Sequence, residues 1–212
     1  MRNTFVLGGA AAVAIASAAS ATTYTGSGGT IPDNNPTGFS SVINVTDDFI
    51  VKDITISLVG LTHTWIGDLV VSITKMDGGA NPSQFLFNRV GKTVATTGFG
   101  DSSNLGGTYS FNDAFTGNLW TAAEGGGTDF TVPGGNYFAS GALSSSQVLL
   151  KPTFAGLHGV GMWKITIVDA AGGDLGSLGS WTLTFEKNPV PAPGALALLG
   201  LAGLAGSRRR RA

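Results

Sequence analysis

Residues 161–169 read Gly-Met-Trp-Lys-Ile-Thr-Ile-Val-Asp, and this stretch decides the fold class. Every second residue from Trp163 to Ile167 is large and apolar, while Lys164 and Thr166 lie between them. A period of two is typical of a β-strand with one face on a core and the other toward solvent. The same period recurs in three further runs, at residues 54–58, 69–74 and 181–186. The sequence therefore predicts antiparallel strands that share one hydrophobic core.

Turns and weaker strands fill the rest of the central region. Weaker strand candidates lie at residues 42–45, 84–88 and 147–150. Residues 22–40 are polar and without periodicity, so we expect an extended or loop lead-in there. Residues 91–147 are mostly Gly-rich, which predicts long loops, a kind of segment that tends to carry function. With no amphipathic helix evident in the sequence between residues 22 and 190, we expect an all-β sandwich or jelly roll.

Composition excludes several classes of protein. A chain of 212 residues holds one moderate domain or two small ones, with a core that needs no disulfides. It has no Cys, which excludes a thiolate nucleophile, a Cys-ligated zinc and an iron–sulfur centre. The two His residues, His63 and His158, are too few for a multi-His metal site. The net charge of −1 argues against nucleic-acid binding.

The first 21 residues have the pattern of a signal peptide. Arg2 is followed by an Ala-rich apolar run, and Ala19-Ser20-Ala21 matches the pattern that signal peptidase accepts. The apolar run is shorter than the about 20 residues that a lasting membrane span needs. We expect residues 1–21 to be removed before Thr22 during secretion; a buried Ala-rich helix is the alternative.

Residues 188–212 form a three-part tail. It contains Pro191-Ala192-Pro193, an apolar stretch from Gly194 to Gly206, and a basic tip. The tip consists of Arg208, Arg209, Arg210 and Arg211. Residues 22–190 hold all 13 acidic residues and seven basic ones, a net charge of −6. A basic tip favours the cytoplasmic side of a membrane, which would leave the acidic centre outside.

This tail resembles the PEP-CTERM sorting signal of Gram-negative bacteria. Ala192 stands where that signal usually has the Glu of its name. The resemblance implies a short transmembrane helix that an exosortase, a membrane transpeptidase-like enzyme, recognises and processes. A plain C-terminal anchor that is never cut is the alternative.

Six motifs occur in order along the central region. They are Ile-Pro-Asp-Asn-Asn at 31–35, His-Thr-Trp-Ile-Gly-Asp-Leu at 63–69, Phe-Asn-Asp-Ala at 111–114, Leu-Ser-Ser at 143–145, the stretch 161–169, and Gly-Asp-Leu-Gly-Ser-Leu at 173–178 followed by Trp-Thr-Leu at 181–183. Their order and spacing resemble the P domain, or homo B domain, of proprotein convertases and bacterial subtilisin-like proteases. Trp65 replaces a usual Tyr, and Asn112 replaces a frequent second Asp. The resemblance implies a jelly roll of about eight antiparallel strands over residues 41–187.

In that family the P domain follows a subtilisin-type catalytic domain and stabilises it. Here only residues 22–40 separate the signal peptide from the first predicted core strand, and the sequence has no G-x-S-x-G elbow. A catalytic triad needs a His base. We expect His63 to have a structural hydrogen-bonding role at a strand end and His158 to lie in a loop. We therefore expect no catalysis by this chain, although the family is associated with serine-type endopeptidases.

Aspartates in the matched motifs suggest calcium. Ca²⁺ takes six to eight oxygen ligands, often from loops, and a secreted domain without disulfides gains stability from such a site. Asp68, Asp113 and Asp174 are the predicted ligands, with Asp169 in a further matched motif. The alternative is that these aspartates only cap turns.

Loop aromatics suggest a third kind of site. Trp65, Tyr109, Trp120 and Tyr137 lie in or near predicted loops, where exposed rings can stack on sugars. The alternative is that these rings pack under their own loops. Trp163 and Trp181 fall on core-facing strand positions and are excluded.

The sequence as a whole predicts an exported, surface-sorted, non-catalytic P-domain protein. It would be a binding or structural module of the bacterial cell surface or extracellular matrix, with an exopolysaccharide as partner. The main alternative is an accessory domain that docks on a separately encoded subtilisin-like serine endopeptidase. A carbohydrate-binding jelly roll and a hydrolase of another type are further alternatives.

Overall fold

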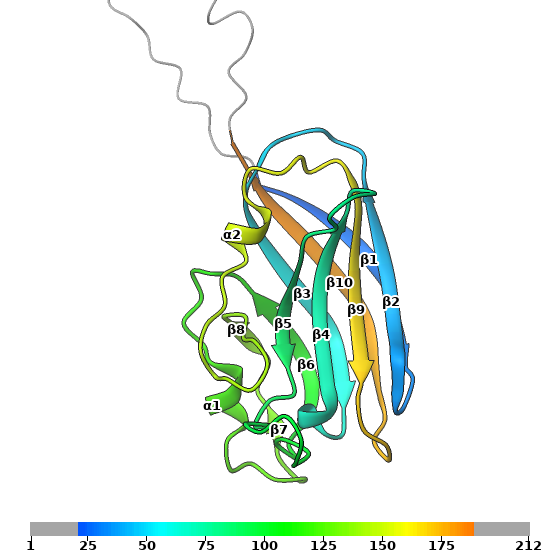
Figure 1. Ribbon diagram of the computed structural model, residues 1–212, viewed down its shortest axis with the longest axis vertical. Helices are drawn as coiled ribbons and strands as arrows, with labels where there is room; N and C mark the ends of the chain where they lie inside the picture. Colours follow the sequence, from blue (N-terminus) through cyan, green and yellow to red (C-terminus); the bar gives the residue numbers. More distant parts are fainter. Residues whose placement is uncertain (1–20, 189–212) are drawn as a thin grey trace, which may run out of the picture.

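The computed structural model describes residues 21–188, which form two β-sheets packed face to face (Figure 1). One sheet contains, in spatial order, β1 (Ala21–Ile31), β10 (Gly176–Lys187), β3 (Val51–His63) and β6 (Asn104–Phe111). The other contains β2 (Asn35–Val45), β9 (Gly161–Asp169), β4 (Leu69–Met76) and β5 (Ser83–Asn88). All neighbours among these eight strands are antiparallel. Two short strands, β7 (Thr131–Val132) and β8 (Gly135–Tyr137), pair in parallel with β6.

The eight long strands have the connectivity of a jelly roll. The chain crosses between the sheets at every connection of these strands except the one from β4 to β5, which pair within one sheet. The first strand, β1, therefore lies beside the last, β10, and β2 lies beside β9. The predicted all-β jelly roll of eight antiparallel strands is confirmed.

The core lies between the sheets, where the alternating residues of the sequence meet. Trp163 of β9 and Phe185 of β10 come from opposite sheets, and their ring centroids are 5.1 Å apart in an edge-to-face arrangement. Both side chains are fully buried, as is Trp181. The indole nitrogen of Trp163 donates to the Gly159 carbonyl (2.8 Å), and that of Trp181 donates to Ser41 Oγ (3.0 Å). Burial of each ring's apolar surface contributes about 2–3 kcal/mol to the stability of the fold, and the indole nitrogen keeps a hydrogen-bond partner.

The predicted lead-in is part of the sandwich, and the predicted boundary at residue 41 is wrong. Residues 22–40 form most of β1, which pairs along β10, and the first half of β2. β1 lacks apolar alternation because it has glycines, instead of residues with large side chains, where it crosses the core. A Cβ atom at Gly26 would collide with the Trp181 indole, and one at Gly29 would collide with the Phe39 ring.

The long loop region contains more structure than predicted. Residues 91–147 include β6, whose two central glycines, Gly106 and Gly107, interrupt the period of two. They also include the five-residue helix α1 (Leu119–Ala123), too short to show a helical period. The predicted strand at 147–150 is wrong: it makes a single bridge to Ser140 and leads into α2 (Lys151–Phe154).

The two ends of the chain lie outside the described residues. The predicted signal peptide, apart from Ala21, and the predicted sorting segment, apart from Asn188, are therefore not part of the structural description. Within residues 21–188, no helix is long and apolar enough to cross a membrane.

Candidate functional site

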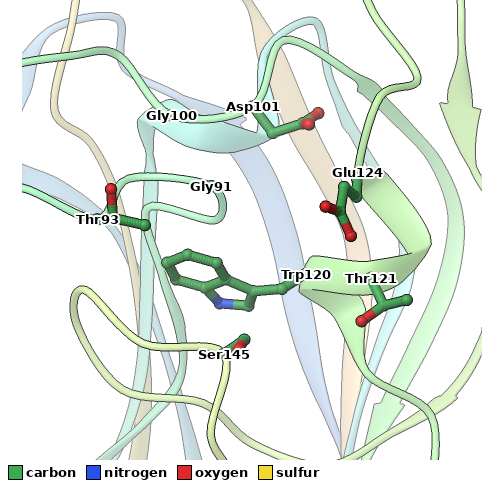
Figure 2. A pocket seen from close by; sticks show the side chains of 8 residues that line it. All are labelled: Gly91, Thr93, Gly100, Asp101, Trp120, Thr121, Glu124 and Ser145. Atoms are coloured by element: carbon green, nitrogen blue, oxygen red, sulfur yellow. The ribbon is translucent and has the colours of Figure 1, made fainter.

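The Trp120 pocket is a cavity of about 340 Å³ between α1 and the connections that follow β5 and β8. Helix α1, which carries Trp120, lies at the end of the sandwich away from the two ends of the described chain (Figure 1). The residues that line the pocket are Gly91, Thr93, Gly100, Asp101, Trp120, Thr121, Glu124 and Ser145 (Figure 2). Its volume falls at the lower end of the range for small-molecule sites, about 300–1,000 Å³.

Hydrogen bonds hold both the backbone and the side chain of Trp120 in this pocket. Its backbone N–H donates to the Asn118 side chain (3.0 Å), which caps the start of α1. Its indole nitrogen donates to Ser140 Oγ (3.2 Å) in the interior. Figure 2 shows the ring extending from α1 toward Thr93, with Ser145 on its other side. Trp120 is only 9% exposed, so the indole presents a narrow, pre-formed apolar edge to a ligand while its polar atom is already satisfied.

Two carboxylates lie on one side of the Trp120 pocket. Asp101 Oδ1 accepts a hydrogen bond from the Ser103 backbone N–H (2.8 Å), and the Asp101 N–H donates to the Val90 carbonyl (2.7 Å). Glu124 is exposed at the end of α1, four residues after Trp120 (Figure 2). Among the described residues that line the pocket there is no Lys or Arg.

This set of groups defines the ligand chemistry. An indole offers a surface for apolar C–H faces and for cations. The hydroxyls of Thr93, Thr121 and Ser145 can donate and accept hydrogen bonds. Two carboxylates attract amines and accept from hydroxyls, whereas they repel anions. The pocket therefore suits a polyhydroxylated ligand that is neutral or positively charged.

The Trp65 pocket, of about 210 Å³, lies next to the first. It is lined by Trp65, Asp68, Phe99, Ala171, Gly172 and Asp174. The Trp65 indole nitrogen donates to the Phe99 carbonyl (3.2 Å), and Asp174 Oδ1 accepts from the Thr64 hydroxyl (2.7 Å). Phe99 is 68% exposed, so its ring is free to contact a ligand.

Asp68 is held in an internal ion pair at the base of the Trp65 pocket. Its carboxylate lies 3.1 Å from the Arg89 guanidinium, which also donates to the Gly67 carbonyl (2.8 Å). Burial raises the pKa of Asp68 to about 6; Arg89 opposes this effect, and the nearby Asp169 and Asp174 add to it. A buried carboxylate that is already paired with Arg89 is poorly available to a ligand.

The three predicted calcium ligands do not converge. Asp113 caps α2, where its two carboxylate oxygens accept from the backbone N–H groups of Leu150 (2.7 Å) and Lys151 (2.9 Å). Asp68 and Asp174 share the Trp65 pocket instead. Within residues 21–188, no three His, Cys, Asp or Glu side chains form a group able to hold a metal ion. The residues present therefore do not fit the single calcium site predicted from the motifs.

Both histidines take the places predicted for them. His63, at the end of β3, is buried, and its Nε2 lies 3.1 Å from a carboxylate oxygen of the equally buried Asp169. Its Nδ1 lies 3.1 Å from the Trp65 backbone nitrogen. His158 lies in the connection between α2 and β9, where its Nδ1 is 2.7 Å from Asp48 Oδ1.

The four loop aromatics divide into two groups. Trp65 is half-buried and lines a pocket; Trp120 also lines a pocket, although it is only 9% exposed. Tyr109 and Tyr137 are buried, and their hydroxyls donate to the carbonyls of Val132 (2.7 Å) and Pro133 (2.6 Å). Burial raises the pKa of both tyrosines, as expected for rings that pack under their own loops.

Sequence reasoning missed the polar half of the Trp120 pocket. Asp101 and Glu124 are 23 positions apart and meet only because the connection after β5 folds back toward α1. One signal was available: Trp120 and Glu124 are spaced i, i+4, which places both on one face of a helix.

Comparisons with known proteins add the following. No family model and no curated protein matches the chain. The solved structures that resemble it include the serine protease of Aeromonas sobria in complex with the chaperone ORF2, and the same protease alone. The TM-score is 0.44 in both cases, with sequence identities of 13% and 14%. The alignments cover 81% and 80% of this chain but only 28% and 27% of the solved chains. Such values do not transfer the activity of those proteins to this one.

Proposed function

We propose that this protein is an exported, non-catalytic binding module of the bacterial cell surface or matrix, built on a P-domain-type jelly roll. Its ligand is a neutral or cationic glycan, bound in the Trp120 pocket. The observation that carries the proposal is that pocket itself, which is lined by a fixed indole, two carboxylates and three hydroxyl-bearing residues.

The position of the pocket supports a role at a surface. The described chain ends after β10, whose first residue pairs with His63 at the pocket end of the sandwich. A strand of 12 residues is about 40 Å long. If the C-terminal tail anchors the protein, the pocket therefore stands at the far end of the domain, away from the membrane and toward the matrix.

A second candidate is an accessory domain for a separately encoded subtilisin-like protease. Phe99 and Leu175 favour it, because these large apolar side chains are 68% and 69% exposed near the Trp65 pocket. Exposed apolar surface of this kind often marks a contact with another protein. In this case the loop end of the sandwich would pack on the protease instead of on a glycan.

Titration calorimetry on the full-length chain in mild detergent tests the proposal. The probes are a neutral cellulose oligomer, a cationic glucosamine oligomer and an anionic alginate oligomer. We expect heat of binding with the first two, strongest with the cationic probe, and none with alginate. Glu124→Gln should weaken binding of the glucosamine oligomer, whereas Glu186→Gln, the other Glu of the chain, should not. Binding of alginate alone, or of none of the three, would contradict the proposal.

A further inference from the structure

The Trp120 and Trp65 pockets share a wall of three consecutive residues. Phe99 lines the Trp65 pocket, whereas Gly100 and Asp101 line the Trp120 pocket. Because Phe99 is followed directly by Gly100 and Asp101, the two cavities lie side by side at the same end of the sandwich.

This wall is held firmly against the core. The Asp101 carbonyl accepts from the Gly67 N–H (2.9 Å), and the Phe99 carbonyl accepts from the Trp65 indole (3.2 Å). Gly100, at φ +79°, and Gly67 are so close that a Cβ atom on either would collide with the other segment. The spacing between the two pockets is therefore built into the fold.

The two pockets share two chemical features, an indole and an available carboxylate. Each contains one indole, Trp120 or Trp65, and each contains two carboxylates. In the Trp65 pocket Arg89 already neutralises Asp68, which leaves Asp174 as the carboxylate available to a ligand. Phe99 adds a second aromatic ring there. Two like pockets at a fixed spacing match a ligand that repeats along its length.

We propose that the two pockets are adjacent subsites for one linear polymer of amino sugars with free amino groups, whose chain crosses the wall at residues 99–101. This inference rests on the proposed function and names its substrate class. Sugar rings lie against the indoles, and amino groups meet Glu124 and Asp101 on one side of the wall and Asp174 on the other. The hydroxyls of the Trp120 pocket favour a sugar over a lysine or arginine side chain, because sugar hydroxyls can both donate to and accept from them, whereas those side chains can only donate.

The test measures affinity against polymer length on the full-length chain. The probes are β-linked glucosamine oligomers from two to six units and their fully N-acetylated counterparts. For the wild type we expect affinity to rise at least about tenfold between the dimer and the hexamer, because the second pocket binds intramolecularly. The N-acetylated hexamer should bind about tenfold more weakly, since it carries no ammonium groups for the carboxylates.

Two pocket variants separate the subsites. Phe99→Ala and Asp174→Asn alter exposed or half-buried groups of the Trp65 pocket and should remove the gain with length, so that hexamer affinity falls toward dimer affinity. Glu124→Gln should weaken dimer and hexamer alike. Phe85→Ala, a partly exposed ring on β5 outside both pockets, is the matched control and should behave as the wild type.

Each contrary outcome has its own meaning. Equal affinity for all lengths, with Phe99→Ala unchanged, would overturn the two-subsite inference and leave the proposed function intact. Tighter binding of oligolysine than of the glucosamine hexamer would overturn the assignment to amino sugars. Failure of every glycan to bind would overturn the proposed function itself.

Discussion

Replacing Asp68 with Asn should remove a specific pH dependence of stability. The Asp68 side chain is 3% exposed, and burial is the main cause that raises its pKa from 3.8 to about 6. As the pH rises above about 4, the unfolded chain loses this proton, while the folded chain keeps it until about pH 6. The folded state therefore binds more protons in this window, and the free energy of unfolding falls as the pH rises. A shift of about two pKa units corresponds to about 3 kcal/mol.

Urea unfolding of the wild type and of Asp68→Asn at pH 4, 5, 6 and 7, followed by Trp fluorescence, measures this effect. Asn cannot ionise, so the difference between the two proteins isolates the carboxyl group. We expect the wild type to lose about 2 kcal/mol relative to the variant between pH 4 and pH 7. A difference that stays constant over this range would refute the idea that burial outweighs the attraction of Arg89.

Three further substitutions test the fold. Gly26→Val should lower the free energy of unfolding by about 1–3 kcal/mol or more in a urea titration, because its side chain collides with the Trp181 indole; an unchanged midpoint would contradict the close packing of β1. Asp113→Ala should cost about 1–2 kcal/mol through loss of the α2 cap, equally in calcium and in EDTA; a cost seen only in calcium would indicate a metal ligand. Trp163→Ala should cost about 3–5 kcal/mol in the same titration, since it leaves a cavity beside Phe154 and Phe185; a loss below about 1 kcal/mol would place this ring outside the core.

The strands that sequence reasoning found are those whose two faces differ. In β9, β10 and β4 one face packs on the opposite sheet and the other meets solvent, so each alternates in hydrophobicity. β1 was missed because it fits against Trp181 only where Gly26 has no side chain. A glycine at a core-facing position removes the apolar residue that a period of two would show there. β6 was missed for a related reason, since Gly106 and Gly107 sit in its middle.

The site was harder to predict than the fold. Loop position and residue type were enough to single out the pocket-lining Trp120 and Trp65, but these criteria did not separate them from Tyr109 and Tyr137, which pack under their own loops. The aspartates illustrate the same limit, because Asp113 caps a four-residue helix that has no visible period. The side chains that share a cavity are brought together by the folding of the long connections between strands. The contacts that fix these connections join residues far apart in the sequence, so short sequence patterns do not reveal them.

A crystal structure of the full-length chain with the glucosamine hexamer is the most direct test of the binding site. The account predicts a sugar ring against Trp120, an amino group within hydrogen-bond distance of Glu124 or Asp101, and a chain that crosses residues 99–101 toward Trp65. A hexamer bound elsewhere on the sandwich, with the Trp120 pocket empty, would contradict it.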